Sequence, residues 1–170
     1  MPKPFKFCPA CASEVDVGDE EERICGSCGR NWYRNSSPSV GAAIVKDGRA
    51  LVTVRGSDPY KGKFDVPGGF LQLGEDVIDA LRRELREELD IEVDVAQSDF
   101  VHMVTHTYGE EDDWVLAIGF VARLTSGTPT PASDVADARW VSLEELDGLE
   151  FAWEHDRELA RKALTMEVEG

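Results

Sequence analysis

The chain has 170 residues, 42% of them hydrophobic, and a formal net charge of −16, which suits one sizeable domain plus a small module. Such an acidic excess argues against a general nucleic-acid or membrane-surface binder, since both need basic patches to meet phosphates. No apolar run is long enough for a membrane span, and the start, MPKPFKFCP, lacks the apolar core of a signal peptide, so we expect a cytoplasmic protein.

All four cysteines lie near the start of the chain, as two Cys-x-x-Cys pairs. They are Cys8 with Cys11, and Cys25 with Cys28. This spacing predicts a tetrahedral zinc site, because each pair presents two thiolates at a turn. The alternative is that the cysteines form disulfides in a secreted domain, but no export signal supports it. Residues 1–35 are therefore predicted to form a zinc ribbon that depends on its metal for folding, and it could pack on the main domain or on a second subunit of a homodimer.

The ribbon also offers a weaker nucleic-acid signal. Arg30 and Arg34 flank Trp32 and Tyr33, a mixture of cations and aromatic rings that suits single-stranded RNA. The acidic run 19–22 belongs to the same ribbon and would repel phosphates. A structural role is favoured and no stable nucleic-acid binding is expected, with ribbon-mediated RNA binding kept as an alternative.

A second domain is expected over residues 36–170, after a segment of linker composition at 34–39. Runs 40–45 and 50–54 predict two strands joined by a hairpin turn at 46–48. Further strands are expected at 100–105, 114–124 and 138–141. Ser142 and Glu145 have capping-box spacing for a helix, and residues 152–166 predict a last helix. The expected fold class is α/β, with a mixed sheet between helices.

Residues 69–91 predict a loop that leads into an amphipathic helix. The apolar side chains fall on one stripe of a helical wheel; they are Val77, Ile78, Leu81, Leu85 and Leu89. Glu84 and Glu88 lie on the border of that stripe, and Glu87 lies one position further round. Like charges on adjacent turns repel one another. Their crowding beside a buried face is explained if a hard divalent cation, Mg²⁺ or Mn²⁺, binds there.

This stretch resembles the Nudix box. The motif positions are occupied here by Gly69, Glu75, Arg83, Glu84, Leu85, Glu87, Glu88 and Ile91. Asp90 stands where the motif has a glycine that closes the helix, a left-handed position that Asp tolerates better than most residues. We expect a modest loss of stability from this departure and no loss of chemistry. The resemblance implies a Nudix α/β/α sandwich, preceded here by the zinc ribbon.

The four-cysteine ribbon, followed by YRN and a strand, is similar to the Nudix subgroup that includes NADH pyrophosphatases. Those enzymes carry the sequence SQPWPFP after the box, and residues 91–120 contain nothing like it. The main support for reduced nicotinamide dinucleotide as the substrate is therefore missing.

The resemblance implies a hydrolase in which water attacks a phosphorus of a nucleoside diphosphate linked to another moiety. ADP-ribose, dinucleoside polyphosphates and dinucleotides are the substrate types. Glu84, Glu87, Glu88 and the main-chain carbonyl of Gly68 would bind Mg²⁺ or Mn²⁺, and Arg83 would orient Glu84. A catalytically silent Nudix domain that senses a nucleotide is the alternative.

Residues outside the box provide the remaining candidates. By position, the general base could be a box glutamate or an acid of the segment Glu110, Glu111, Asp112 and Asp113. Arg55 follows a predicted strand and could contact a phosphate or be a solvated surface residue. Tyr108 resembles the downstream tyrosine of Nudix members that cleave dinucleoside polyphosphates, and either it or Phe70 could stack on a base. We expect His102 and His106 to be structural, and Glu75 to tie the loop to the helix N-terminus.

Overall fold

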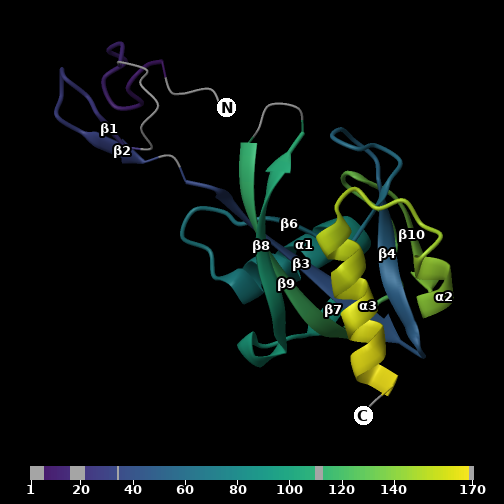
Figure 1. The fold of residues 1–170 in the computed structure, drawn as a ribbon. Helices are drawn as coiled ribbons and strands as arrows, with labels where there is room; N and C mark the ends of the chain where they lie inside the picture. Colours follow the sequence, from purple (N-terminus) through teal and green to yellow (C-terminus); the bar gives the residue numbers. More distant parts are fainter. Residues whose placement is uncertain (1–5, 16–21, 34, 110–112, 169–170) are drawn as a thin grey trace.

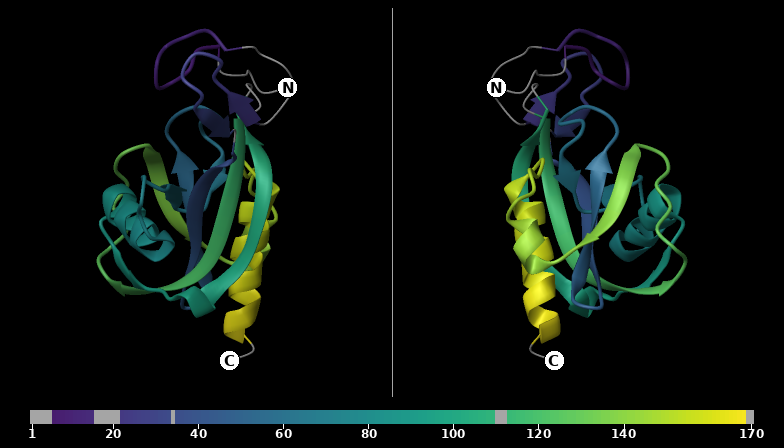
Figure 2. Two further views of the ribbon diagram at one scale, coloured as in Figure 1. Left: turned by 90° about the vertical axis from the view of Figure 1, so that its left-hand side faces the viewer. Right: turned by 90° about the vertical axis from the view of Figure 1, so that its right-hand side faces the viewer.

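A mixed β-sheet lies between two helices in the computed structural model, which describes residues 6–15, 22–33, 35–109 and 113–168 (Figures 1 and 2). The strands are β1 (Glu22–Ile24), β2 (Asn31–Tyr33), β3 (Ser37–Lys46), β4 (Arg49–Arg55), β5 (Phe64–Asp65), β6 (Gly68–Phe70), β7 (Glu92–Asp94), β8 (Phe100–Tyr108), β9 (Asp113–Ser126) and β10 (Val135–Val141). The helices are α1 (Val77–Leu89), α2 (Leu143–Leu146) and α3 (Glu154–Val168), with a 3-10 turn η1 (Gln97–Asp99).

The sheet has the strand order β10-β4-β3-β9-β7, with β8 paired to β9, β6 to β3 and β5 to β4. The central pair β3 and β9 is parallel, and the other described pairs of this sheet are antiparallel. Helix α1 covers one face and α3 the other (Figure 2), each over its own cluster of buried apolar side chains. The α/β class and the α/β/α sandwich are confirmed.

The first hairpin forms where the sequence predicts it. Strands β3 and β4 pair in antiparallel fashion up to Lys46 and Arg49. Asp47 and Gly48 between them have φ angles of 52° and 70°, the positive values that a two-residue turn of type I′ requires.

Helix α1 is closed by an aspartate at each end. The side chain of Asp76 accepts a hydrogen bond from the backbone N–H of Ile78 and so caps the N-terminus. Asp90 closes the other end in a left-handed conformation, with φ 55° and ψ 43°. The predicted use of Asp in place of glycine at this position is confirmed.

The glycine-rich segment before α1 differs from the predicted loop. Gly68–Phe70 pairs with β3 as the short strand β6. The pairing is close because Gly68 has a φ of 151°, and a Cβ atom there would lie 2.1 Å from the carbonyl oxygen of Val40. A strand at this position is invisible in the pattern because glycine has no β propensity. It fixes the start of the Nudix box to the centre of the sheet.

Elsewhere the element bounds change modestly. The last strand begins at Val135 and not at residue 138, and the helix after Ser142 is a single turn, α2. Both hydrogen bonds of the predicted capping box between Ser142 and Glu145 are present. Within the described ranges no helix is long and apolar enough to cross a membrane.

The N-terminal segment forms the two-stranded sheet of β1 and β2 around a small cluster of Cys8, Val15 and Cys25. Its strands lie at the outer end of β3, away from α1 and α3 (Figure 1). The division into a ribbon over residues 1–35 and a domain over 36–170 stays a prediction.

Candidate active site

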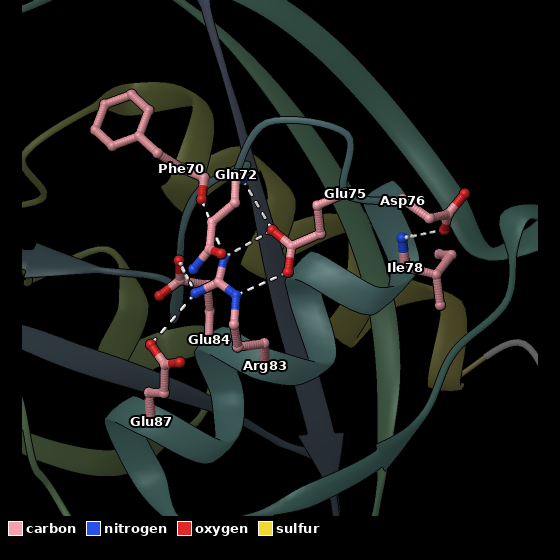
Figure 3. Close-up of polar contacts among 8 residues, drawn as sticks. All are labelled: Phe70, Gln72, Glu75, Asp76, Ile78, Arg83, Glu84 and Glu87. Atoms are coloured by element: carbon pink, nitrogen blue, oxygen red, sulfur yellow. Dashed lines mark hydrogen bonds and ion pairs between the residues drawn. The ribbon is translucent and has the colours of Figure 1, made fainter.

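The guanidinium of Arg83 connects the loop before α1 to the acidic face of the helix (Figure 3). It donates to both carboxylate oxygens of Glu75, at 2.8 and 2.9 Å, and to the carbonyl oxygen of Phe70 at 3.2 Å. Its Nη1 donates to Glu84 at 2.8 Å and to Glu87 at 3.3 Å. The predicted contact between Arg83 and Glu84 is therefore present. Glu75 also accepts from the backbone N–H of Gln72, so that it ties the loop to the helix through Arg83.

The carboxylate of Glu84 lies directly against Gly69. A Cβ atom at Gly69 would be 2.5 Å from Cδ of Glu84 and 2.6 Å from its Oε1. No side chain larger than hydrogen fits without moving this carboxylate. The first residue of the box is thus glycine because a glutamate of α1 occupies the space next to it.

Glu88 is a buried carboxylate, with 6% of the residue exposed. Its Oε2 accepts a hydrogen bond of 2.9 Å from the backbone N–H of Gly68. Burial, together with the carboxylates of Asp134 and Glu84, raises the pKa of Glu88 well above its ordinary value, although the Gly68 bond opposes the shift. Burial also raises the pKa of Glu84, with smaller contributions from Glu87 and Asp134.

Asp134 is a site residue that the sequence reasoning missed. It precedes β10 and lines the same cavity as Glu88. The backbone N–H groups of Thr130 and Ala132 donate to the carbonyl oxygens of Leu89 and Glu88, which holds this loop against the end of α1. Nothing in the sequence links this loop to the Nudix box. The carboxylate of Asp134 comes near the box only because these backbone hydrogen bonds hold the loop on α1.

These carboxylates suit a divalent cation by their chemistry. Glu84 and Glu88 are oxygen donors of the kind that Mg²⁺ and Mn²⁺ prefer. Burial raises the pKa of each, and neighbouring carboxylates add to the shift. Among the described residues, however, the four cysteines are the only group of three or more His, Cys, Asp or Glu side chains whose ligand atoms all lie within 4.8 Å of one another. The α1 glutamates would therefore turn toward a shared ion on binding it. Their metal role, and that of the Gly68 carbonyl, stay predictions.

The three substrate-contact candidates lie together in that cavity. Phe70 and Tyr108 meet edge to face, with ring centroids 5.5 Å apart. The guanidinium of Arg55 donates to Asp65 at 2.8 Å, to the Tyr108 hydroxyl at 3.1 Å and to the carbonyl oxygen of Pro59 at 2.7 Å. Arg55 is therefore a buried, paired cation and not a solvated one, and its proposed contact with phosphate stays a prediction.

The loop candidates for a general base are only partly described. Glu110, Glu111 and Asp112 lie outside the described residues. Asp113 begins β9 and is paired in register with Tyr108. His102 and His106 project from one strand, β8, and both line the cavity.

The four cysteines gather at the N-terminal ribbon. Their four Sγ atoms all lie within 4.8 Å of one another. Cys8 and Cys25 are buried, and Cys11 and Cys28 are exposed. The indole N–H of Trp32 donates to Sγ of Cys8 at 3.3 Å, the type of outer contact that orients a metal ligand. This cluster could bind zinc, as the spacing predicts.

Comparison with known sequences assigns the family. The family model of the NUDIX domain matches residues 36–163. The chain belongs to the NUDIX family. A curated relative, the NAD-capped RNA hydrolase NudC of Pseudomonas aeruginosa, is 30% identical over 146 residues, which cover 85% of this chain and 50% of NudC. An ADP-ribose pyrophosphatase of Methanocaldococcus jannaschii is 29% identical over 119 residues, or 70% of this chain and 69% of that protein. The chain thus spans about half the length of the NudC relatives that it matches.

Solved structures share the fold. The crystal structure of a NUDIX hydrolase from Nitrosomonas europaea superimposes with a TM-score of 0.76 over 98% of this chain and 94% of its own, at 21% identity. A MutT NUDIX hydrolase from Burkholderia pseudomallei gives a TM-score of 0.65 at 29% identity, over 76% of this chain and 98% of its own. The first of these covers the N-terminal segment as well as the sandwich.

The Glu75–Arg83 pair predicts a specific dependence of stability on pH. Hydrogen bonds from Arg83, then from the backbone of Gln72, lower the pKa of Glu75 from 4.5 to about 2. A carboxylate whose pKa is lowered on folding stabilises the fold above its unfolded pKa, and this contribution is lost as the pH falls toward the folded value. Urea unfolding of wild type and Glu75→Gln should therefore show a difference in unfolding free energy that is larger at pH 7 than at pH 3. An equal difference at the two pH values would contradict the pairing.

Proposed function

We propose that this NUDIX protein hydrolyses the pyrophosphate of a nucleoside diphosphate linked to another moiety, with Mg²⁺ or Mn²⁺. The observation that carries the proposal is the gathering of three carboxylates: Glu88 and Asp134 line one cavity, and Glu84 interacts electrostatically with both. The relatives' names support it, because NAD-capped RNA and ADP-ribose each contain a pyrophosphate between a nucleoside and a second group. The proposed substrate class is therefore the nucleoside diphosphate linked to another moiety, which includes both molecules.

The residues of α1 would hold the metal, while the network around Arg83 sets their orientation. When bound, the ion supplies neutralising charge for the phosphates and lowers the pKa of a bound water. Glu84 keeps one oxygen on Arg83 and has the other available, whereas Glu87 is half exposed and free to turn. Arg55, paired to Asp65, cannot supply charge neutralisation alone, which leaves that task to the ion.

Two carboxylates are placed to accept the proton of the attacking water. Burial raises the pKa of Glu88 well above its ordinary value, the direction that favours a general base. Asp134 is exposed and belongs to a loop held on α1. We favour Asp134, because Glu88 is buried and already accepts the Gly68 N–H.

A pair of matched variants tests the metal role. Glu87 and Glu92 are both exposed glutamates, 54% and 50%, and each pairs with an arginine at 3.3 Å. We expect Glu87→Gln to lower metal-dependent hydrolysis of ADP-ribose, NAD or a dinucleoside polyphosphate on the order of a hundredfold or more, since even outer-shell changes cost ten- to a hundredfold. Glu92→Gln should leave it unchanged. Turnover by Glu87→Gln at the wild-type rate would remove this residue from the site.

Gly69→Ala tests the geometry of the same site without removing a carboxylate. The new methyl group would displace Glu84, and a shift of about 1 Å in an active site can lower the rate about a hundredfold. Gly148→Ala is the control, because its Cβ would make only an ordinary contact at 3.6 Å. Both variants should unfold near the wild-type temperature.

The N-terminal ribbon is proposed to hold structural zinc through Cys8, Cys11, Cys25 and Cys28. Metal analysis of the purified chain should give one zinc per chain, and Cys28→Ser should reduce that content while hydrolysis by the α/β domain is kept. A zinc-free chain with four reactive thiols and an intact fold would contradict the assignment.

A further inference from the structure

Asp134 is an exposed loop residue, although its proposed role requires a carboxylate that is held in place. The loop joins β9 to β10 over residues 127–134. The backbone N–H groups of Thr130 and Ala132 hold its first half on α1. Catalytic groups have to be held within about 0.5 Å of their working positions, so a further contact close to Asp134 is needed.

The backbone of Gly56, directly after β4, makes that contact. Its N–H donates a hydrogen bond of 2.6 Å to the carbonyl oxygen of Asp134. The bond continues the antiparallel pairing of β4 with β10, in which Arg55 lies opposite Val135. The main chain of Asp134 is thereby attached to the same sheet that carries Gly68 on β6.

Residue 56 is a glycine because of space and not because of its backbone conformation. A Cβ atom at Gly56 would lie 2.7 Å from the carbonyl oxygen of Asp134 and 3.2 Å from its carbonyl carbon. Its φ angle is not in the left-handed region, in contrast to that of Gly62, which is 85° and beside which a Cβ would meet nothing within 4 Å. Close approach of two backbones is a recognised reason for glycine. A side chain at residue 56 would therefore push the backbone of Asp134 away.

The backbone on both sides of Asp134 departs from regular structure. The pairing of β10 with β4 shifts register around Ala136, whose backbone nitrogen would lie 3.4 Å from a Cβ at Gly56. Such bulges bend a strand and re-aim the side chains beside them, and they are frequent next to active sites. Ser133 has a φ angle of 57°, a costly conformation that persists only where the surroundings impose it. The loop therefore has an imposed conformation at the point where it presents Asp134.

The carboxylate that this backbone presents lies on the α1 side of the cavity. Asp134 lines the cavity together with Glu88 and Gly68. Its negative charge also adds to the raised pKa values of Glu84 and Glu88, for which burial is the largest cause. A displacement of the Asp134 backbone would therefore change how this carboxylate faces the two glutamates.

We propose that Gly56 is a positioning residue, whose N–H and lack of a side chain fix Asp134 opposite the α1 glutamates. The inference rests on the proposed function, in which Asp134 accepts the proton of the attacking water. Gly56 acts only through Asp134 and contacts no reacting atom itself. Its substitution should therefore slow the chemical step and leave substrate binding unchanged.

A double-mutant cycle tests whether Gly56 acts through Asp134. We expect Gly56→Ala to lower kcat for metal-dependent hydrolysis of ADP-ribose, NAD or a dinucleoside polyphosphate about ten- to a hundredfold, the effect of a misplacement of about 1 Å, with KM unchanged. Asp134→Asn should lower kcat about a hundredfold or more, as loss of a general base does. In the Asp134→Asn background, Gly56→Ala should have no further effect, because residues that act as a unit are not additive.

Three results of the cycle would overturn the proposal. One is that the two effects on kcat multiply, since Gly56 would then act independently of Asp134. The second is a raised KM with unchanged kcat in Gly56→Ala, which would assign the residue to substrate binding. The third is a wild-type kcat in Asp134→Asn, because the residue that Gly56 positions would then have no part in the reaction.

Binding of Mn²⁺ to the full chain, measured by electron paramagnetic resonance, gives the same cycle without hydrolysis. Gly56→Ala and Asp134→Asn should each weaken binding about tenfold, the lower end of the loss from an outer-shell change, and the double variant should bind as Asp134→Asn does. A coupled cycle in a chain that hydrolyses none of the substrates would contradict only the proposed function. If neither variant changes Mn²⁺ binding in such a chain, the inference is overturned as well. Hydrolysis with multiplied effects would contradict this inference alone.

Gly148→Ala serves as the matched control, because a Cβ at that glycine has 3.6 Å of space; it should alter neither hydrolysis nor Mn²⁺ binding. If Gly56→Ala does not fold, amide hydrogen exchange of the wild-type chain decides. The N–H of Gly56 should exchange as slowly as the N–H groups of β4, because it is bonded to Asp134. Exchange at the rate of an unbonded amide would overturn the proposal.

Discussion

The site depends on one arginine that is surrounded by acids. Arg83 holds Glu75 with two parallel bonds and reaches Glu84, Glu87 and the backbone of Phe70 with the rest of its guanidinium. A planar fork of donors can make these contacts at once, which a lysine cannot. The pairing offsets the repulsion among glutamates of adjacent turns and fixes the loop on the helix. One arginine does not neutralise three glutamates, so net negative charge remains at this end of α1 for a cation to neutralise.

The residues that line the cavity differ in chemistry from the α1 side to the α3 side. At the α1 end, carboxylates and the glycine backbone of β6 suit a metal and the phosphates that it binds. Near α3 the lining is instead made of the three histidines, Trp153 and Asp156. Arg55 belongs to the same lining and is paired with Asp65 at 2.8 Å. It therefore keeps a carboxylate of the cavity wall paired.

Local patterns in the sequence predicted the parts of the fold that depend on local physics. The hairpin at Asp47, the capping box at Ser142 and the left-handed Asp90 are each decided within a few residues. The features that were missed depend on tertiary contacts. Strand β6 exists because β3 accepts the backbone of Gly68, and Asp134 reaches the site through a loop bound to the end of α1. Asp65 of β5 and Asp156 of α3 line one cavity although they lie far apart in the chain, and no spacing rule relates such positions.

We propose that the α1 glutamates, with Asp134 opposite them, hold a divalent cation at the α1 side of the cavity. Anomalous scattering from crystals of the full chain soaked with Mn²⁺ measures this directly. We expect a manganese peak bounded by carboxylate oxygens of Glu84, Glu87 and Glu88, with Asp134 facing it, and a weakened peak in Glu87→Gln. A fully occupied peak elsewhere in the molecule, with none at α1, would contradict it.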